Sequence, residues 1–248
     1  MLEWLGLPVA ASAHAAEVDR IMALIHWLML VLFVGWSVFF VYVLVRFRSG
    51  ANPQANYRGV KGRWSTWVEG GVLVAEIVLL AFFSIPFWRT NVDAAPPAGQ
   101  ATMLRVVAEQ FTWYAHYPGA DGVFGRTEIA LVNPDNPLGL DRNEAVGKDD
   151  IIAINRMNLP VGKPAVIMLS SKDVIHSFAL PQMRVKQDAI PGIVQPVWFT
   201  PTQVGRWDVA CSQLCGLGHF RMRAIYEIQT QDAYEAWLKE EAEFLANP

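Results

Sequence analysis

The chain has 248 residues, of which 53% are hydrophobic and only 17% are charged, and its formal net charge is −3. The length allows one or two domains, and the weakly negative charge excludes a globally basic protein that binds nucleic acid. The hydrophobic excess is concentrated in residues 21–45 and 68–88. We therefore expect a protein anchored in a lipid bilayer, with a separate domain outside the bilayer.

Residues 1–20 combine a short apolar stretch around Trp4 with a run of small residues, Ala-Ser-Ala-His-Ala-Ala. Small residues are typical of a signal-peptide cleavage site, but the basic n-region and a long apolar h-region are missing. We therefore interpret this segment as a short exported N-terminus.

Residues 21–45 carry no acidic or basic side chain, and a run of that length spans a bilayer with some tilt. We expect His26, near its outer end, to lie at the interface or between helices. The following loop, residues 46–63, has no Asp or Glu and holds five basic residues: Arg46, Arg48, Arg58, Lys61 and Arg63. Short loops rich in Lys and Arg stay cytoplasmic, so the N-terminus is expected outside.

Residues 68–88 form the second predicted span, with Trp64 and Trp67 before it and Trp88 at its end. Tryptophans at both ends of an apolar run are typical of a span flanked by the two membrane interfaces. The chain should therefore return to the outer side, which places both termini outside.

The second span contains two carboxylates, Glu69 and Glu76. Seven residues are almost two helical turns, so both lie on about the same face. A carboxylate in lipid is costly, and that face should therefore meet protein or water. Glu69 could also be a solvated acid at the interface. Glu76 should face a partner subunit, either as a hydrogen-bonded structural acid or as part of a proton route.

The residues after the second span predict a different kind of domain. Pro96 and Pro97 mark a linker, so we divide the chain into residues 1–92 and 93–248. The second part holds 13 basic and 18 acidic residues. Such a surface attracts a basic partner protein, although a solvated acidic surface is the simpler explanation.

Short alternating runs separated by Gly and Pro predict an all-β sandwich or barrel in residues 93–248. Residues 133–150 are expected to form a surface loop, and residues 230–245 an amphipathic helix capped by Thr230. The expected strands lie at residues 102–113, 151–155, 165–169, 196–200, 206–210 and 223–228.

Four potential metal ligands recur near the C-terminus at spacings of four, four and three residues: Cys211, Cys215, His219 and Met222. The two cysteines are the only ones in the chain. Thiolate, imidazole and thioether are soft donors that suit copper better than a hard cation. His176, which we expect at the end of a strand, is a fifth candidate from a distant segment.

Two alternatives remain open from the spacing alone. The cysteines could form a disulfide outside the membrane, but that would not explain His219 and Met222. A structural zinc site could use both cysteines with His176 and His219, but zinc does not need a thioether. Gly216 and Gly218 also suggest that the loop is shaped around a bound group.

The segment Cys211-Ser-Gln-Leu-Cys215-Gly-Leu-Gly-His219-Phe-Arg-Met222 resembles the copper loop of subunit II of the haem-copper oxidases, the cytochrome c oxidase family. The segments Asp173-Val-Ile-His176-Ser-Phe and Lys186-Gln-Asp-Ala-Ile-Pro-Gly192 are similar to two further parts of that subunit, in the same order. The resemblance covers nearly the whole chain.

This resemblance implies a two-helix transmembrane hairpin followed by a cupredoxin-like Greek-key β-sandwich. It also implies a binuclear CuA centre, in which Cys211 and Cys215 bridge two coppers and His176 and His219 each supply an imidazole. Met222 and the backbone carbonyl of Gln213 would be the axial donors.

The resemblance further implies an electron-entry role in the respiratory chain. A c-type cytochrome would supply electrons, which pass to haem in the catalytic subunit I, where oxygen is reduced to water with proton translocation. Further oxidase subunits are expected as partners. The membrane would be a bacterial inner membrane, with the copper domain in the periplasm or on the outer face.

The chain departs from the family pattern at three places, which concern the magnesium site, electron entry and the proton path. Many members have Glu where this chain has Gln213, and an amide is a weaker ligand for a hard cation, so an interface magnesium ion is in doubt. Phe111 replaces the tryptophan credited with electron entry, while Trp113 remains. Glu69 matches the family's glutamate at a proton path but lacks the Trp-Thr-x-x-Pro that usually follows, so Glu76 could share or replace its role.

The chain has no Cys-x-x-Cys-His motif, so we expect haem only in the partner subunit. A quinol oxidase subunit would lack the copper ligands, all of which are present. A tethered copper chaperone or sensor would need an exposed, labile site and no partner-facing helices. A copper domain of the nitrous-oxide-reductase type is conceivable, but the predicted hairpin argues against it.

Overall fold

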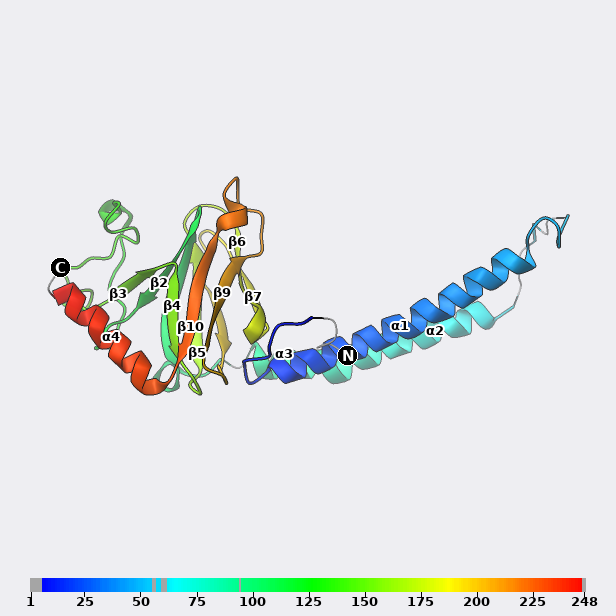
Figure 1. Ribbon diagram of the computed structural model, residues 1–248, viewed down its shortest axis with the longest axis horizontal. Helices are drawn as coiled ribbons and strands as arrows, with labels where there is room; N and C mark the ends of the chain where they lie inside the picture. The colour runs from blue at the N-terminus through cyan, green and yellow to red at the C-terminus, as the bar shows by residue number, and fades with distance from the viewer. Residues whose placement is uncertain (1–5, 55–56, 59–61, 94, 247–248) are drawn as a thin grey trace. The chain divides into compact units, whose positions relative to one another are not determined.

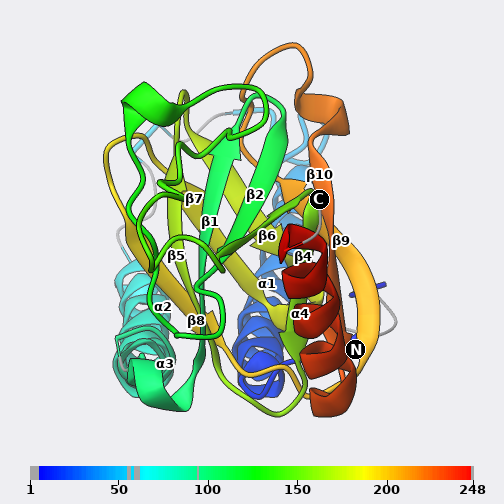
Figure 2. The same cartoon turned by 90° about the vertical axis from the view of Figure 1, so that its left-hand side faces the viewer.

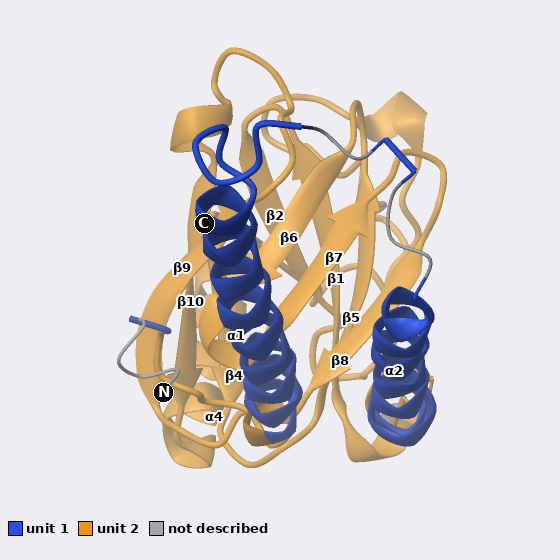
Figure 3. Ribbon diagram, turned by 90° about the vertical axis from the view of Figure 1, so that its right-hand side faces the viewer, with its two compact units in different colours: residues 1–7, 17–90 blue, residues 8–16, 91–248 orange. Residues whose placement is uncertain are grey.

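The computed structural model describes residues 6–54, 57–58, 62–93 and 95–246. These residues form two compact units, one of residues 1–7 and 17–90 and one of residues 8–16 and 91–248 (Figure 3). Trp4 and Lys61, considered above, lie outside the described residues. Each unit is described below by itself.

The first unit is helical and consists of α1 (Ala15–Arg46), α2 (Trp64–Leu79), a π-helical turn (Leu80–Ser84) and α3 (Ile85–Asn91) (Figure 1). Two stretches, Ala15–Arg46 and Trp64–Asn91, are long and apolar enough to cross a membrane. Both expected spans are confirmed as helices. The helices are longer than the apolar runs because a helix continues through charged residues beyond the hydrocarbon region.

The π-helical turn ends at Ser84, two residues before Pro86, which is the second residue of α3. A proline ring clashes with the carbonyl four residues earlier in a regular α-helix. In this chain Ile85 donates its N–H to the carbonyl of Leu80, five residues earlier. This wider turn is the kind of local adjustment that lets a helix continue past a proline.

The second unit contains two five-stranded sheets with the orders β3-β2-β1-β5-β8 and β4-β10-β9-β6-β7. This arrangement confirms the expected β-sandwich. Neighbouring strands are antiparallel except for the pairs β1–β5 and β10–β4. The strands are β1 (Thr102–Glu109), β2 (Thr112–Tyr117), β3 (Ile151–Ile154), β4 (Arg156–Pro160), β5 (Ala165–Ser171), β6 (His176–Leu180), β7 (Val185–Ala189), β8 (Gln195–Phe199), β9 (Gly205–Cys211) and β10 (Arg223–Gln229).

The core lies between the two sheets. Successive side chains of a strand point to opposite faces, and β1 accordingly buries Leu104, Val106 and Ala108 while the residues between them are half-buried. Strand β10 shows the same alternation in the second sheet. The opposed buried faces form one continuous cluster, from which the segments that carry the candidate ligands extend.

Helix α4 (Gln231–Ala246) follows β10 and packs against β3, β4 and β10 (Figure 2). Thr230 Oγ1 accepts a hydrogen bond of 3.3 Å from the N–H of Ala233, which confirms the predicted cap. Trp237 is buried, and its ring meets that of Tyr117 edge-on at 5.0 Å. The helix thus covers the side of the sandwich where the edge strands β3 and β4 lie.

Residues 8–16 belong to the β unit, although they lie before α1 or, for Ala15 and Ala16, at its start. The N–H of Ala11 donates to the carbonyl of Gln182, and the N–H of Thr202 donates to the carbonyl of Ala11. Ser12 Oγ donates to the carbonyl of Met183 at 2.7 Å. We call residues 8–16 the N-terminal strap. Ala11 is fully buried, so this segment is part of the domain and not a free tail.

Some elements differ from those predicted. Residues 102–113 include the turn of a hairpin, and strands β4, β6 and β7 were not predicted. Strand β6 is buried at every position, so it lacks the alternation that reveals a half-buried strand. His176 begins this strand; the expectation that it ends one was wrong. Residues 133–150 are not purely a surface loop, because Leu138 and Leu140 are buried.

Candidate metal centre

The five candidate side-chain ligands come from two segments of the second sheet. His176 is the first residue of β6, and the segment from Cys211 to Met222 connects β9 to β10. We call residues 211–222 the ligand loop. Its ends are joined because the N–H of Cys211 donates to the carbonyl of Met222 at 3.2 Å. In Figure 1 the orange ligand loop extends past the ends of the strands.

The donor atoms form a continuous cluster. Cys211 Sγ lies 3.9 Å from His176 Nδ1 and 3.8 Å from Cys215 Sγ. Cys215 Sγ in turn lies 3.6 Å from His219 Nδ1 and 3.7 Å from Met222 Sδ. Each histidine therefore presents Nδ1 to one cysteine, and the two cysteines lie at the centre. The structure brings together all five side chains that the sequence singled out.

The sixth predicted donor, the backbone carbonyl of Gln213, also reaches this cluster. Its oxygen lies 3.2 Å from Cys211 Sγ. The side chain of Gln213 is on an exposed residue of the loop. The structure therefore places the backbone carbonyl of Gln213 beside Cys211 Sγ.

Burial shields three of the five side chains from water, while Cys211 and His219 are half-buried. His176 is fully buried, and Cys215 and Met222 are only 4% and 3% exposed. Burial, followed by the neighbouring Cys211, raises the pKa of the Cys215 thiol to about 11. A pair of sulfur atoms in such a place carries negative charge only when a cation compensates it.

A disulfide does not fit the geometry. The two sulfur atoms are 3.8 Å apart, compared with about 2.05 Å in a disulfide, and both cysteines are free. A zinc site could use His176 and the two cysteines, whose donor atoms lie within 4.8 Å of one another, but it would leave the thioether of Met222 unused. The full donor set, with its imidazole, thiolate and thioether groups, fits a copper centre.

Asp173 fixes the orientation of His176. Its Oδ1 lies 2.9 Å from His176 Nε2, and its Oδ2 accepts a hydrogen bond of 2.7 Å from the N–H of Gln110. Burial acts to raise the pKa of Asp173, but hydrogen bonds from His176 and from Gln110 hold it below its ordinary value. With Nε2–H donated to this carboxylate, the lone pair of Nδ1 is directed toward Cys211 Sγ, where a metal ion could bind both.

The two predicted electron-entry aromatics occupy different positions. Phe111 is partly buried and packs against the ligand loop. Its ring lies so close to Gly218 that a Cβ at that glycine would be only 2.5 Å from it. Trp113 is only 3% exposed and lies in the core, with its ring centroid 6.1 Å from that of His176. Of these two side chains, only Phe111 lies where a partner protein could touch it.

Sequence reasoning missed the apolar surface of the ligand loop. Leu214, Leu217 and Phe220 are 79%, 98% and 86% exposed. Three large apolar side chains exposed on one short loop indicate a protein interface more than an isolated hydrophobic residue does. The available signal was their position in and beside the turn that contains Gly216 and Gly218, where a solvent-exposed turn would carry polar residues.

Glu69 and Glu76 both lie on α2, in the helical unit, and both are exposed in the isolated chain. Glu69 lines a cavity of about 630 Å³ together with residues of α1, including Trp36 and Phe39. The structure thus gives Glu69 space beside it, while Glu76 lies on a surface of the helical unit. Neither carboxylate belongs to the metal cluster.

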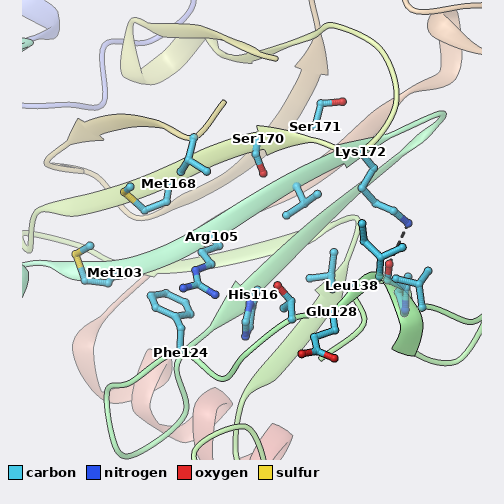
Figure 4. Close-up of a pocket in the computed structure, with 16 residues that line it drawn as sticks. Met103, Arg105, His116, Phe124, Glu128, Leu138, Met168, Ser170, Ser171 and Lys172 are labelled. Atoms are coloured by element: carbon cyan, nitrogen blue, oxygen red, sulfur yellow. Dashed lines mark hydrogen bonds between the residues drawn. The ribbon is translucent and has the colours of Figure 1, made fainter. Parts of the chain in front are cut away.

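A second cavity, of about 640 Å³, lies on the outer face of the first sheet and is bordered by the segment between β2 and β3 (Figure 4). Three of its polar side chains have partners. His116 Nε2 lies 2.5 Å from Asp150 Oδ2, and Lys172 Nζ lies 2.8 Å from Glu109 Oε2. Arg105 stacks on the ring of Phe124 at 4.3 Å. The cavity contains none of the predicted metal ligands.

Comparison with known proteins gives consistent results. The profile of the family described as cytochrome c oxidase subunit II, periplasmic domain, matches residues 103–229. The alternative cytochrome c oxidase subunit 2 of Bradyrhizobium diazoefficiens is 32% identical over 242 residues, covering 97% of this chain and 85% of the relative. Cytochrome c oxidase subunit 2 of Cereibacter sphaeroides is 26% identical over 257 residues, covering 96% and 83%.

Among solved structures, the periplasmic domain of subunit II of the cytochrome oxidase of Bradyrhizobium japonicum is similar, with 26% identity and a TM-score of 0.45. The match covers 61% of this chain and 99% of that domain. The residues matched by the family profile include His176 and the entire ligand loop.

Proposed function

Because the chain belongs to the subunit II family of cytochrome c oxidases, we propose that it accepts electrons from a c-type cytochrome at a binuclear copper centre and passes them to haem in the catalytic subunit. The observation that carries this proposal is the donor cluster, in which two thiols lie 3.8 Å apart and each meets one imidazole nitrogen. Reduction of oxygen to water and the coupled proton translocation take place in the partner subunit.

The residues that would hold the coppers are Cys211, Cys215, His176, His219 and Met222, together with the backbone carbonyl of Gln213. When bound, such a pair supplies a one-electron centre whose bond lengths change little, because the electron is shared between the two ions. The burial of His176, Cys215 and Met222 favours a resident metal over an exchangeable one. The donor set leaves no obvious open position for a substrate.

The chain's own residues perform three tasks in this proposal. The carboxylate of Asp173 holds the imidazole of His176 with Nδ1 toward the sulfur atoms. The buried ligands exclude water, which keeps the surroundings of the site constant in both redox states. Phe111 and the exposed apolar residues of the ligand loop offer a surface on which partner proteins can dock.

The helical unit anchors the domain and faces the catalytic subunit, with both termini on the outer side of a bacterial inner membrane. Glu69 is our candidate for the entrance of a proton path, supported by the cavity beside it, and Glu76 could share that role. Gln213 offers no carboxylate, so magnesium at the subunit interface would depend on ligands from elsewhere.

Low-temperature electron paramagnetic resonance (EPR) with copper quantitation tests this proposal on the full chain in detergent. We expect two coppers per chain and a seven-line hyperfine pattern, because the unpaired electron couples equally to two copper nuclei. A four-line spectrum from one copper, or a chain that binds zinc and no copper, would contradict it. Rapid mixing with a reduced c-type cytochrome should then show oxidation of that donor.

A further inference from the structure

All metal ligands come from the second sheet, yet the first sheet also reaches the site. Strands β1 and β2 are joined by the two residues Gln110 and Phe111, which we call the hairpin tip. The tip supplies no ligand. It contacts both ligand-bearing segments, the ligand loop and the segment that ends in His176.

The first contact is with the ligand loop. Gln110 Nε2 donates a hydrogen bond of 2.5 Å to the carbonyl of Cys215, the residue whose sulfur is close to Cys211, His219 and Met222. Gly216 has a φ of +133°, and a Cβ there would lie 2.7 Å from Gln110 Nε2. The loop therefore has a glycine where the glutamine side chain approaches its backbone.

The second contact is with the His176 segment. The backbone N–H of Gln110 donates to Asp173 Oδ2 at 2.7 Å, and Asp173 Oδ1 lies 2.9 Å from His176 Nε2. The N–H of Val174 also donates to Asp173 Oδ1, at 2.7 Å. The carboxylate is thereby held at both oxygens, and its position relative to the ligand loop depends on Gln110.

We propose that Gln110 is a positioning residue that fixes the Cys215 side of the metal site relative to the His176 side. Its side-chain amide holds the ligand loop, and its backbone amide holds Asp173 and through it His176. This inference rests on the proposed copper centre, and it adds a residue that is neither a ligand nor an aromatic electron-entry group. Residues that orient metal ligands typically change metal affinity by about 10–100-fold when they are replaced.

The chemistry predicts which substitutions matter. In Gln110→Ala the carbonyl of Cys215 loses its partner, while the backbone bond to Asp173 stays. In Gln110→Glu a carboxylate of the same shape replaces the donor and repels both the carbonyl and the sulfur atoms. Gln110 is an exposed residue of a hairpin turn, so its replacement leaves the core unchanged. Gln231→Glu on the exposed start of α4 introduces the same charge change away from the ligand loop.

The experiment uses the full chain in detergent, loaded with copper. We measure the rate of copper loss to an excess of chelator, the copper hyperfine splitting and the reduction potential for wild type, both Gln110 variants and Gln231→Glu. Copper should be lost about tenfold faster or more from both Gln110 variants, with altered hyperfine splitting and a shifted potential. Gln231→Glu should match the wild type in all three measurements.

The outcomes separate this inference from the function on which it rests. If the wild type holds two coppers and both Gln110 variants match it in copper loss, spectrum and potential, Gln110 does not position the site. If the wild type itself holds no copper pair, the proposed function is wrong and the inference is overturned with it. Circular dichroism verifies the fold, and should Gln110→Glu not fold, the result for Gln110→Ala decides.

Discussion

Met222 closes the ligand loop with its thioether 3.7 Å from Cys215 Sγ and only 3% of its surface exposed. Met222→Leu keeps the size and the apolar character of the side chain, so the fold should tolerate it. Loss of a weak electron-donating ligand disfavours the more positive oxidised state. The reduction potential should therefore rise by on the order of 50 mV, or about 1 kcal/mol for one electron.

Redox titration together with copper analysis checks this prediction. The copper content of Met222→Leu should equal that of the wild type, because in the proposed centre the thiolates and imidazoles hold the metal. A variant that binds no copper would show that the thioether is an essential ligand and not a weak axial one.

His116 and Asp150 form a buried pair at the cavity of Figure 4, 1% and 0% exposed. The pKa of His116 is lowered, chiefly because the imidazole is buried. Asp150 acts to raise this pKa, whereas the charges of Arg105 and Arg142 lower it further. An unfolded histidine has a pKa of about 6.5. Below that value the unfolded chain binds more protons than the folded one, so the free energy of unfolding should decrease as the pH falls from 7 to 5.

Urea unfolding of the full chain in detergent, followed by tryptophan fluorescence at several pH values, measures this dependence. His116→Gln retains a donor for Asp150 but cannot titrate. Its free energy of unfolding should change less steeply with pH than that of the wild type, by up to about 1.4 kcal/mol per pH unit. Equal slopes in the two proteins would exclude His116 as the source.

The cluster of candidate metal ligands could be predicted from the sequence because four of its members lie within twelve residues and their chemistry is distinctive. The positions of Gln110 and Asp173 could not. Gln110 meets Cys215 across 105 residues of sequence, and nothing local in β1 reveals which loop its turn will contact. The assignment of Trp113 to the core likewise depends on which strand face points inward, which only the packing of both sheets decides.

At the scale of elements, α2 carries the two carboxylates that the sequence placed on one helical face. Glu69→Ala should slow oxygen reduction by the assembled oxidase on the order of tenfold, because a group that relays protons would be lost. The copper spectrum should not change, since α2 contributes no ligand. Oxygen consumption and EPR on the same preparation measure both quantities.

Glu76→Ala is the matched variant on the same face of α2. A normal rate in Glu69→Ala combined with a slow rate in Glu76→Ala would move the proton path to Glu76. Normal rates in both variants would remove α2 from any such path.

The predictions were most accurate for strands with one face toward solvent, because their sequences alternate between apolar and polar residues. Strands β1 and β10 alternate and were found, whereas β6 is buried on both faces and was missed. Strand β7 was also missed, although it pairs along its whole length with β6. A strand whose neighbours lie far away in sequence gains its stability from packing and not from its own composition.

At the scale of the whole molecule, the N-terminal strap makes the β unit depend on residues far from it in sequence. Ala11 is fully buried, so Ala11→Asp places a charge among apolar groups and should lower the free energy of unfolding by several kcal/mol. Val9 lies on the same strap but is 49% exposed. Val9→Asp should therefore change stability by less than about 0.5 kcal/mol.

Urea unfolding monitored by tryptophan fluorescence distinguishes the two variants. Equal stabilities of Ala11→Asp, Val9→Asp and the wild type would mean that the strap is not docked in solution. Hydrogen exchange at the amides of Ala13 and Thr202, which bond to the carbonyls of Thr200 and Ala11, should be fastest in Ala11→Asp.

The strap also has a consequence for biogenesis. Residues 8–16 and the strands from β1 onward form one folded unit, while α1 and α2 lie between them in the chain. The strap and the strands must therefore reach the same side of the membrane, although they are translocated at different times because α1 and α2 lie between them in the chain. A chain whose first helix inserts in the wrong direction would leave the backbone partners of Ala11 unpaired and apolar surface of the β unit uncovered. Completion of the β unit is thus an internal check that the hairpin was inserted correctly.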